Sequence, residues 1–155
     1  MSHSNKSINQ TDIRLLETDN PASFTDLIWL FAEVFEMDNF KLPPAAYQKK
    51  LLEREDFLVF AAFHQQKVIG GLTTYVLHQY YEEKPLAYIY DVAVATDWQR
   101  QGIGRMLINA HNDYCRKQGF AEAYVQADLE DDHAIEFYRK TQAAEAPVVQ
   151  FSYYF

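Results

Sequence analysis

The chain has 155 residues, which is enough for one domain with a complete hydrophobic core. Hydrophobic residues make up 48% of it and aromatic residues 15%, so the chain is globular rather than disordered. The formal net charge of −8 argues against a nucleic-acid partner, because phosphate backbones are bound by Lys and Arg patches. An acidic chain suits a cationic ligand if its carboxylates line a cleft, and the charge serves solubility equally well.

Two features of the sequence bear on where the protein works. No apolar run approaches the length of a membrane-spanning helix, so no membrane partner is expected. Cys115 is the only cysteine and cannot form an internal disulfide, which predicts a cytoplasmic location and a packing role rather than a nucleophilic one. Residues 1–10 lack an apolar signal segment and are expected to be a disordered tail, which leaves residues 11–155 as a single domain.

The first elements are predicted to be a strand and two helices. Residues 13–16 form a short apolar strand, and apolar residues from Phe24 to Phe35 then recur at helical spacing, with Ser23 as a candidate N-cap. Pro44 suits the first turn of a second helix, which is expected to bury Tyr47, Leu51 and Leu52.

Three strands follow in an antiparallel meander. Residues 57–63 form an apolar, buried strand, and the polar residues 64–67 form the turn after it. Residues 68–78 return as the second strand, in which Gly70 and Gly71 indicate a bulge or a close approach of another backbone. Residues 88–94 form the third strand after a short connection, and short connections favour antiparallel neighbours.

The stretch from residue 88 to residue 108 organises the rest of the chain. Its strand breaks at residues 95–97, a polar glycine-bearing loop follows at 99–104, and apolar residues then recur at helical spacing from Ile103. A strand, a glycine loop and a helix in this order aim backbone N–H groups and the helix dipole at one point, which predicts an anion site. The loop lacks the Gly-Lys-Ser/Thr of a Walker loop and the G-x-G-x-x-G of a Rossmann fold, and taken alone it fits a plain turn equally well.

The last third of the chain is predicted to contain a strand, a helix and a final strand. Gln118-Gly119 ends the preceding helix, and residues 121–127 form a strand, so strand, helix and strand form a parallel crossover. Asp131 or Asp132 caps a helix that carries Ala134, Ile135 and Tyr138. Residues 147–155 are rich in β-formers and are expected to be the last strand.

Asp91 is the candidate general base. It lies in the middle of an apolar strand, where a lone carboxylate is costly to bury unless it faces a cleft or is paired with backbone amides at a bulge. An amine must lose its proton before it attacks an acyl carbon, and either a carboxylate or a water can accept that proton. The period of two places Asp91 opposite Tyr90 unless a bulge intervenes. The three histidines at 78, 111 and 133 lack the spacing of metal ligands, so no metal is expected.

The loop and its strand resemble the acetyl-CoA-binding motif of the GNAT superfamily of N-acetyltransferases. The resemblance rests on Gln99-x-x-Gly102-x-Gly104 after Asp91-Val92-Ala93-Val94. It implies that loop amides hold the pyrophosphate of coenzyme A, that the strand binds the pantetheine arm, and that the N–H near Val94 polarises the acetyl carbonyl. The implied cofactor-binding residues are Val92, Ala93, Val94, Gln99, Arg100, Gln101, Gly102, Ile103, Gly104 and Arg105.

A second stretch extends the resemblance. Asp131-x-x-Ala134-x-x-x-Tyr138 resembles a further signature of the family, in which Asn commonly stands at the place of Asp131. Tyr138 then matches the tyrosine that protonates the leaving thiolate, although a core aromatic is the alternative. The family usually has Gly where Gln142 stands; this departure from the family pattern leaves the conformation of the turn open and does not touch the cofactor site. The implied fold is α/β (α+β): a mixed, mostly antiparallel sheet of six to seven strands, about four helices, and splayed strands four and five.

The sequences of residues 88–94 and 124–128 resemble the class I aminoglycoside 3-N-acetyltransferases. That resemblance implies direct acetyl transfer to the 3-amino group of a polycationic aminoglycoside, with no acyl-enzyme. The candidate acceptor-binding residues are Glu33, Glu36, Asp38, Asp91, Asp128 and Asp131. Glu33, Glu36 and Asp38 are alternatively solvated charges at helix ends, and Asp131 is alternatively a helix cap. Two alternative functions remain: acetylation of another amine (a polyamine, an amino acid or a protein N-terminus), and binding of acetyl-CoA as a sensor without catalysis.

The C-terminal segment is too apolar to be left exposed. Its side chains either complete the sheet of their own chain or mediate a homodimer; they are Phe151, Tyr153, Tyr154 and Phe155.

Overall fold

The computed structural model describes residues 10–155, so of the tail predicted over residues 1–10 all but Gln10 lies outside the described range. The chain divides into two compact units, Met1–Val125 and Gln126–Phe155, and each is described by itself. A single domain over residues 11–155 stays a prediction. Within residues 10–155, no helix has the length and apolar character needed to cross a bilayer.

The first unit is one mixed sheet between helices. Its five strands lie in chain order and are β1 (Thr11–Leu15), β2 (Phe57–His64), β3 (Lys67–Leu77), β4 (Leu86–Val94) and β5 (Glu122–Val125). The first four pair antiparallel, and β4 and β5 pair parallel, as the crossover through α3 (Ile103–Lys117) requires. The sheet has five strands in the described chain, whereas six to seven were expected.

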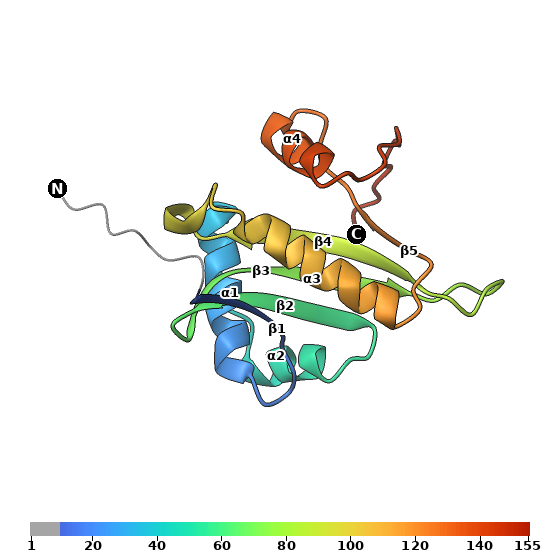
Figure 1. The fold of residues 1–155 in the computed structure, drawn as a ribbon. Helices are drawn as coiled ribbons and strands as arrows, with labels where there is room; N and C mark the ends of the chain where they lie inside the picture. The colour runs from blue at the N-terminus through green and yellow to red at the C-terminus, as the bar shows by residue number, and fades with distance from the viewer. Residues whose placement is uncertain (1–9) are drawn as a thin grey trace. The chain divides into compact units, whose positions relative to one another are not determined.

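Helices cover the two faces of this sheet differently (Figure 1). The face covered by α1 (Pro21–Val34) and α2 (Ala45–Leu52) is called the α1 face, and the face covered by α3 is called the α3 face. The core of the α1 face joins α1 to β2; its members include Phe24, Leu27, Phe31, Phe57, Val59 and Ala61. On the α3 face, Phe60 meets the ring of His111 edge-on, with 5.6 Å between ring centroids.

The close approach of α1 to the sheet explains Gly71. A Cβ at this position would lie 2.5 Å from Leu27 Cδ1 and 2.7 Å from the Phe60 carbonyl oxygen, so any larger residue would push α1 away from the sheet. The turn before β3 is shorter than predicted. His64 and Lys67 belong to the strands, and only Gln65 and Gln66 turn the chain, with φ of 48° and 67°, as in a two-residue hairpin.

Two helix predictions need correction. Helix α1 begins at Pro21 and not after Ser23: Asn20 is its N-cap, and Pro at the first helical position has no N–H to satisfy. Tyr47 is 52% exposed, and α2 buries Gln48 in its place. The Gln48 side chain accepts a hydrogen bond from Thr25 Oγ1 (2.7 Å) and donates one to the Pro43 carbonyl (2.8 Å), so the contact of α2 with α1 is partly polar.

The second unit holds α4 (Asp132–Lys140) followed by an extended tail. Residues 147–155 were expected to form the last strand, but they have no strand conformation. A strand needs a partner for its backbone groups, and none of the strand pairings in the described chain includes these residues. Their large apolar side chains are exposed, with Val148, at 66%, the least exposed of them.

Candidate active site

A bulge in β4 decides which way Asp91 points. The register with β3 passes from Thr74 opposite Ile89 to Thr73 opposite Asp91, so Tyr90 is an extra residue in β4. Thr73 and Thr74 point to opposite faces, since side chains alternate along β3. Thr74 faces α3, because its hydroxyl lies 2.9 Å from Nε2 of His111 on that helix. Asp91 therefore lies with Thr73 on the α1 face, the reverse of what an uninterrupted period of two from Ile89 would give.

The Asp91 carboxylate is partly buried and accepts few hydrogen bonds. Its Oδ2 accepts one hydrogen bond, from Thr73 Oγ1 at 3.2 Å. Burial raises the pKa of Asp91, and the hydrogen bond from Thr73 opposes that rise only in part. None of the ion pairs found among residues 10–155 includes Asp91. A carboxylate with a raised pKa and no paired cation has the character of a general base.

Beyond the bulge, one edge of β4 is left without a partner strand. The parallel pairing with β5 spans only Leu86–Ile89 opposite Glu122–Val125, while β4 continues to Val94. The Ala95 N–H donates to the Ile69 carbonyl on β3 at 2.8 Å. Because backbone groups alternate between the two edges of a strand, the Val94 N–H points to the edge where β5 has ended. This is the pairing pattern expected where strands four and five splay.

The loop after β4 has the geometry of an anion cradle. A 3₁₀ helix, η2 (Thr96–Trp98), precedes it, and Arg100 and Gly102 both have positive φ, 59° and 84°. The first helical hydrogen bond runs from Met106 N–H to the Gly102 carbonyl. In the described chain, the N–H groups of residues 101–104 donate no hydrogen bond. They are the unsatisfied donors at the start of α3, and they fit a pyrophosphate.

The side chains of this loop have different roles from its backbone. Gln99 Nε2 donates to the Val94 carbonyl at 3.0 Å, and Gln101 Nε2 donates to the Asp97 carbonyl at 3.2 Å. Both glutamines thus hold the loop in place by bonds within the protein. Ile103 is 1% exposed, so its side chain belongs to the core and only its backbone is available to a ligand. The Arg100 and Arg105 side chains are exposed beside the cradle.

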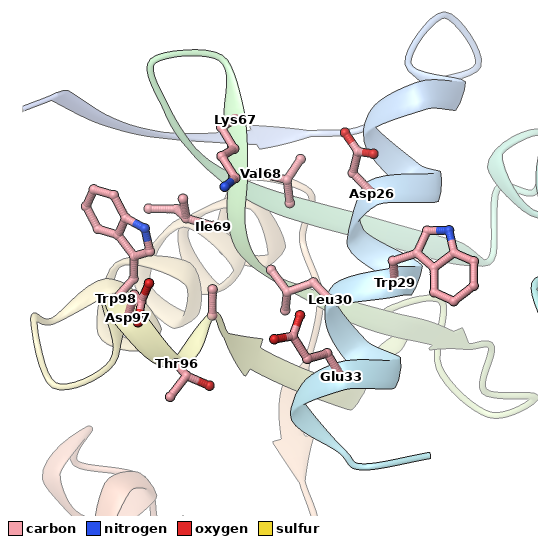
Figure 2. Close-up of a pocket in the computed structure, with 11 residues that line it drawn as sticks. Asp26, Trp29, Leu30, Glu33, Lys67, Val68, Ile69, Thr96, Asp97 and Trp98 are labelled. Carbon is pink, nitrogen blue, oxygen red and sulfur yellow. The ribbon is translucent and has the colours of Figure 1, made fainter. Parts of the chain in front are cut away.

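A cleft of about 440 Å³ lies between α1 and the β4–α3 connection (Figure 2). Trp29 and Trp98 stand on opposite sides of it, and the carboxylates of Asp26, Glu33 and Asp97 line it together with Lys67. Glu33 is the one predicted acceptor-binding residue that lines this cleft. Asp91 is not part of it, so we place the candidate reaction centre at the β4 bulge, where a desolvated carboxylate lies beside a free strand edge.

The remaining predicted site residues fall in two places. Glu36 and Asp38 are exposed on the α1–α2 connection, where Glu36 has a φ of 50°. Asp128 and Asp131 belong to the second unit, and Asp131 Oδ1 accepts a hydrogen bond from the Ala134 N–H at 3.0 Å. Asp131 is therefore the N-cap of α4, as one of the two sequence interpretations had it.

Tyr138 and Gln142 complete the second unit. Tyr138 is half-buried on α4, with its ring against Phe137. Gln142 has a φ of 66°, the left-handed conformation that favours glycine. The turn after α4 thus keeps a glycine-like backbone although the sequence has no glycine there, and the departure from the family pattern affects only the side chain.

A model of the Acetyltransferase (GNAT) family matches residues 23–143. The chain belongs to this family. Members of the family use acetyl-CoA, in agreement with the anion cradle at the start of α3.

Solved structures similar to this acetyltransferase cover nearly the whole chain. The aminoglycoside acetyltransferase meta-AAC0020, from an uncultured soil metagenomic sample and in complex with sisomicin, is 51% identical, with a TM-score of 0.93 over 95% of this chain and 97% of that one. The aminoglycoside acetyltransferase HMB0005, also from an uncultured soil metagenomic sample, is 32% identical, with a TM-score of 0.87 over 94% and 98%.

Curated relatives match a shorter part of the chain. The uncharacterized N-acetyltransferase MJ1207 of Methanocaldococcus jannaschii is 33% identical over 69 residues, which is 44% of this chain and 30% of the relative. The acetyltransferase chain therefore spans less than a third of the length of the curated relatives it matches.

Cys115 is a poor candidate for a covalent acetyl carrier in this acetyltransferase. It is 4% exposed, and burial raises the pKa of its thiol to about 11, so little thiolate forms near neutral pH. Its sulfur lies 3.6 Å from Nε2 of His111, inside the α3 face. Burial also lowers the pKa of His111, which keeps this histidine neutral in the core.

Two groups of residues at the acetyltransferase site were missed by the sequence analysis. Thr73, which donates to Asp91, has no motif of its own, and its role follows only from the register of β3 and β4. The rings of Tyr75, Tyr88 and Tyr90 surround the same place, and the period of two had separated Tyr90 from Asp91. The sequence carries no sign of the bulge; it allowed only the statement that a bulge, if present, would bring Asp91 and Tyr90 to the same face.

Proposed function

We propose that this acetyltransferase transfers the acetyl group of acetyl-CoA to an amino group of an aminoglycoside, and specifically to the 3-amino group. The observation that carries the proposal is the 51% identity, over 95% of the chain, to an aminoglycoside acetyltransferase in complex with sisomicin. The net charge of −8 agrees with an acceptor that carries several positive charges. The choice of the 3-amino group rests on the resemblance of residues 88–94 and 124–128 to class I 3-N-acetyltransferases.

Acetyl-CoA would be held by the β4–α3 loop and the free edge of β4. The N–H groups of residues 101–104 would bind its pyrophosphate, with Arg100 and Arg105 adding charge. Val92 to Val94 would bind its arm along the strand edge that β5 leaves open. Acetyl-CoA supplies the acetyl group as an activated thioester.

The chain's own groups would then perform three tasks. Asp91 would accept the proton of the acceptor ammonium, directly or through a water, so that a neutral amine can attack. The Val94 N–H would donate a hydrogen bond to the acetyl oxygen as negative charge develops on it. Tyr138 would return a proton to the departing sulfur. Transfer would be direct, because the one thiol of the chain is buried with a raised pKa.

Two other functions make different demands on these residues. Acetylation of a polyamine, an amino acid or a protein N-terminus would use the same cradle and the same base with another acceptor. A coenzyme sensor would need the cradle but would have no use for a desolvated Asp91. Acetyl transfer to sisomicin, spermidine and a small peptide, measured side by side with NMR mapping of the products, distinguishes the three.

The expected result is 3-N-acetylation of the aminoglycoside, with kcat/KM reduced at least about 100-fold in Asp91→Asn, as for loss of a general base. Asp113→Asn is the matched control, since Asp113 is an exposed carboxylate on α3 that pairs with Arg116. Preference for spermidine or the peptide would overturn the acceptor assignment alone. No turnover despite tight acetyl-CoA binding would favour the sensor.

A further inference from the structure

Four tyrosine rings form a continuous array across the α1 face of the sheet, next to Asp91. Tyr75 on β3 meets Tyr90 on β4 at 5.5 Å between centroids, with ring planes at 89°. Tyr90 meets Tyr88 at 5.8 Å and 87°. Tyr88 in turn stacks on Tyr124 of β5 at 4.9 Å, with planes only 11° apart. We call these four residues the tyrosine array.

The β4 bulge creates this array. In a regular strand the extra residue would not exist, and Asp91 would turn to the α3 face with Ile89. With Tyr90 inserted, its ring reaches both Tyr75 and Tyr88, while Asp91 emerges beside Thr73 on the same face. The bulge thus brings aromatic rings and a carboxylate together at one point of the sheet.

Core packing accounts for only part of the array: Tyr75 contacts the buried Phe57 at 5.2 Å between centroids, yet two of the four rings are exposed. Tyr90 is 60% exposed and Tyr75 is 38% exposed, although a large aromatic ring in the core would be almost fully covered. The hydroxyls of Tyr75 and Tyr88 remain neutral near pH 7, since burial raises the pKa of both groups. Their rings therefore present uncharged, electron-rich faces to whatever lies above the sheet.

The charge around the array is negative. Asp91 is the nearest carboxylate, and none of the ion pairs found among residues 10–155 includes it. The cation that acts on Tyr75 is Arg54, whose guanidinium is held by Asp56 through two hydrogen bonds of 2.7 Å each. A ring face within about 6 Å of an ammonium attracts it, and a neighbouring carboxylate strengthens that preference for a cation.

We propose that the tyrosine array binds a protonated amino-sugar ring of the acceptor, with an ammonium group over the Tyr90 ring, and that Tyr90 thereby determines acceptor specificity. The inference rests on the proposed function and adds to it the residues that would recognise the charge. The array would hold the acceptor at the place where Asp91 accepts the proton of the reacting amine. An uncharged acceptor would gain no cation–π attraction from the same surface.

The test compares Tyr90→Leu with Tyr90→Phe, using sisomicin as the acceptor. Leucine removes the ring and phenylalanine keeps it, so KM for sisomicin should rise about 3- to 30-fold in Tyr90→Leu and stay near wild type in Tyr90→Phe. KM for acetyl-CoA should not change in either variant. Tyr80→Leu is the matched control, because Tyr80 is 98% exposed on the β3–β4 connection, where its ring meets that of Tyr81.

A graded experiment tests the cation–π contact itself. Phenylalanine with one, two or three ring fluorines at position 90 weakens the negative ring face while nearly keeping its shape, so KM for sisomicin should rise with each fluorine. A flat response, or an unchanged KM in Tyr90→Leu, would overturn the array while leaving acetyl transfer to sisomicin intact. Wild-type protein that acetylates no aminoglycoside would overturn the proposed function and the array together. Tyr75→Leu, compared with Tyr75→Phe, repeats the test on a second strand if a variant at position 90 fails to fold.

Discussion

Asp91 makes the fold less stable near neutral pH. Its raised pKa means that the folded protein holds a proton there more tightly than the unfolded chain does. The resulting stabilisation is fully present below the unfolded pKa, near 4, and is lost as the pH rises through the folded pKa. Asparagine at position 91 does not titrate and can still accept the hydrogen bond from Thr73.

Asp91→Asn should therefore raise the free energy of unfolding at pH 7, although it removes activity. The gain over wild type should shrink toward zero as the pH falls below about 4, because the wild-type carboxyl is then protonated in both states. Urea unfolding of both proteins from pH 3.5 to pH 8 measures this difference. Equal stability at pH 7 would mean that burial does not penalise the Asp91 carboxylate.

Single residues also mark the limit of what the sequence could predict about the site. Asp91 and the glycines of the loop were found because a carboxylate in an apolar strand and a glycine pair before a helix are local signals. The orientation of Asp91 could not be predicted from its neighbours in the sequence, since it depends on one extra residue in the pairing of β4 with β3. The positive φ of Gln142 could not be predicted from glutamine itself, and its one indication was that the family usually has Gly at this place.

At the scale of elements, helix α3 offers a matched pair of glycines. Gly102 precedes its first residue with a φ of 84°, and Gly119 follows its C-cap with a φ of 77°. A Cβ at either position would meet no atom within 4 Å, so alanine adds backbone strain but no clash. The two glycines differ in position alone: one borders the anion cradle, and the other lies at the far end of the helix.

Gly102→Ala and Gly119→Ala should each lower the free energy of unfolding by about 1–2 kcal/mol, the cost of a left-handed conformation for a residue with a Cβ. Only Gly102→Ala should also weaken acetyl-CoA binding, because relaxing that strain moves the cradle N–H groups. Thermal unfolding and calorimetric titration with acetyl-CoA measure both effects. Equal acetyl-CoA affinity in the two variants would show that the cradle geometry does not depend on Gly102.

Elements with strong local patterns were the predictable part of the fold. The β2–β3–β4 meander, α3 and the crossover to β5 follow from apolar periodicity, short turns and glycine stops, and the structure has all of them. The start of α1 was wrong because Ser23 was taken as the cap, although Asn20 followed by Pro21 is the local start of the helix. The buried face of α2 was wrong because the polar contact of Gln48 is with Thr25, far along the chain. The last strand was wrong because β-forming composition alone supplies no pairing partner.

At the scale of the whole molecule, the C-terminal segment, residues 147–155, exposes apolar side chains that a binding partner could cover. Phe151, Tyr153 and Tyr154 are each more than 80% exposed, at 82%, 83% and 93%. Contiguous apolar side chains of this kind mark interaction surfaces. We propose that a second copy of the chain covers them, which would make the protein a homodimer.

Light scattering should therefore give the mass of a dimer for the wild type. A variant with serine at positions 151, 153 and 154 should be a monomer, because it removes the apolar area that would be buried. Serine at Tyr80 and Tyr81, which are 98% and 71% exposed on the β3–β4 connection, is the control and should leave the dimer intact. A monomeric wild type at high concentration would refute the homodimer.

The order of strands in the sheet has a consequence for how the chain is made. Each strand lies beside its predecessor in the sequence, from β1 at one edge to β5 at the other (Figure 1). As the chain leaves the ribosome from its N-terminus, every new strand meets a neighbour that has already been synthesised, and the β2–β3 hairpin forms with little loop-closure entropy. Strand β5 alone must wait for α3, so its parallel contact with β4 closes late. The edge of β4 between Leu86 and Ile89 is thus the last part of the sheet to gain its partner strand.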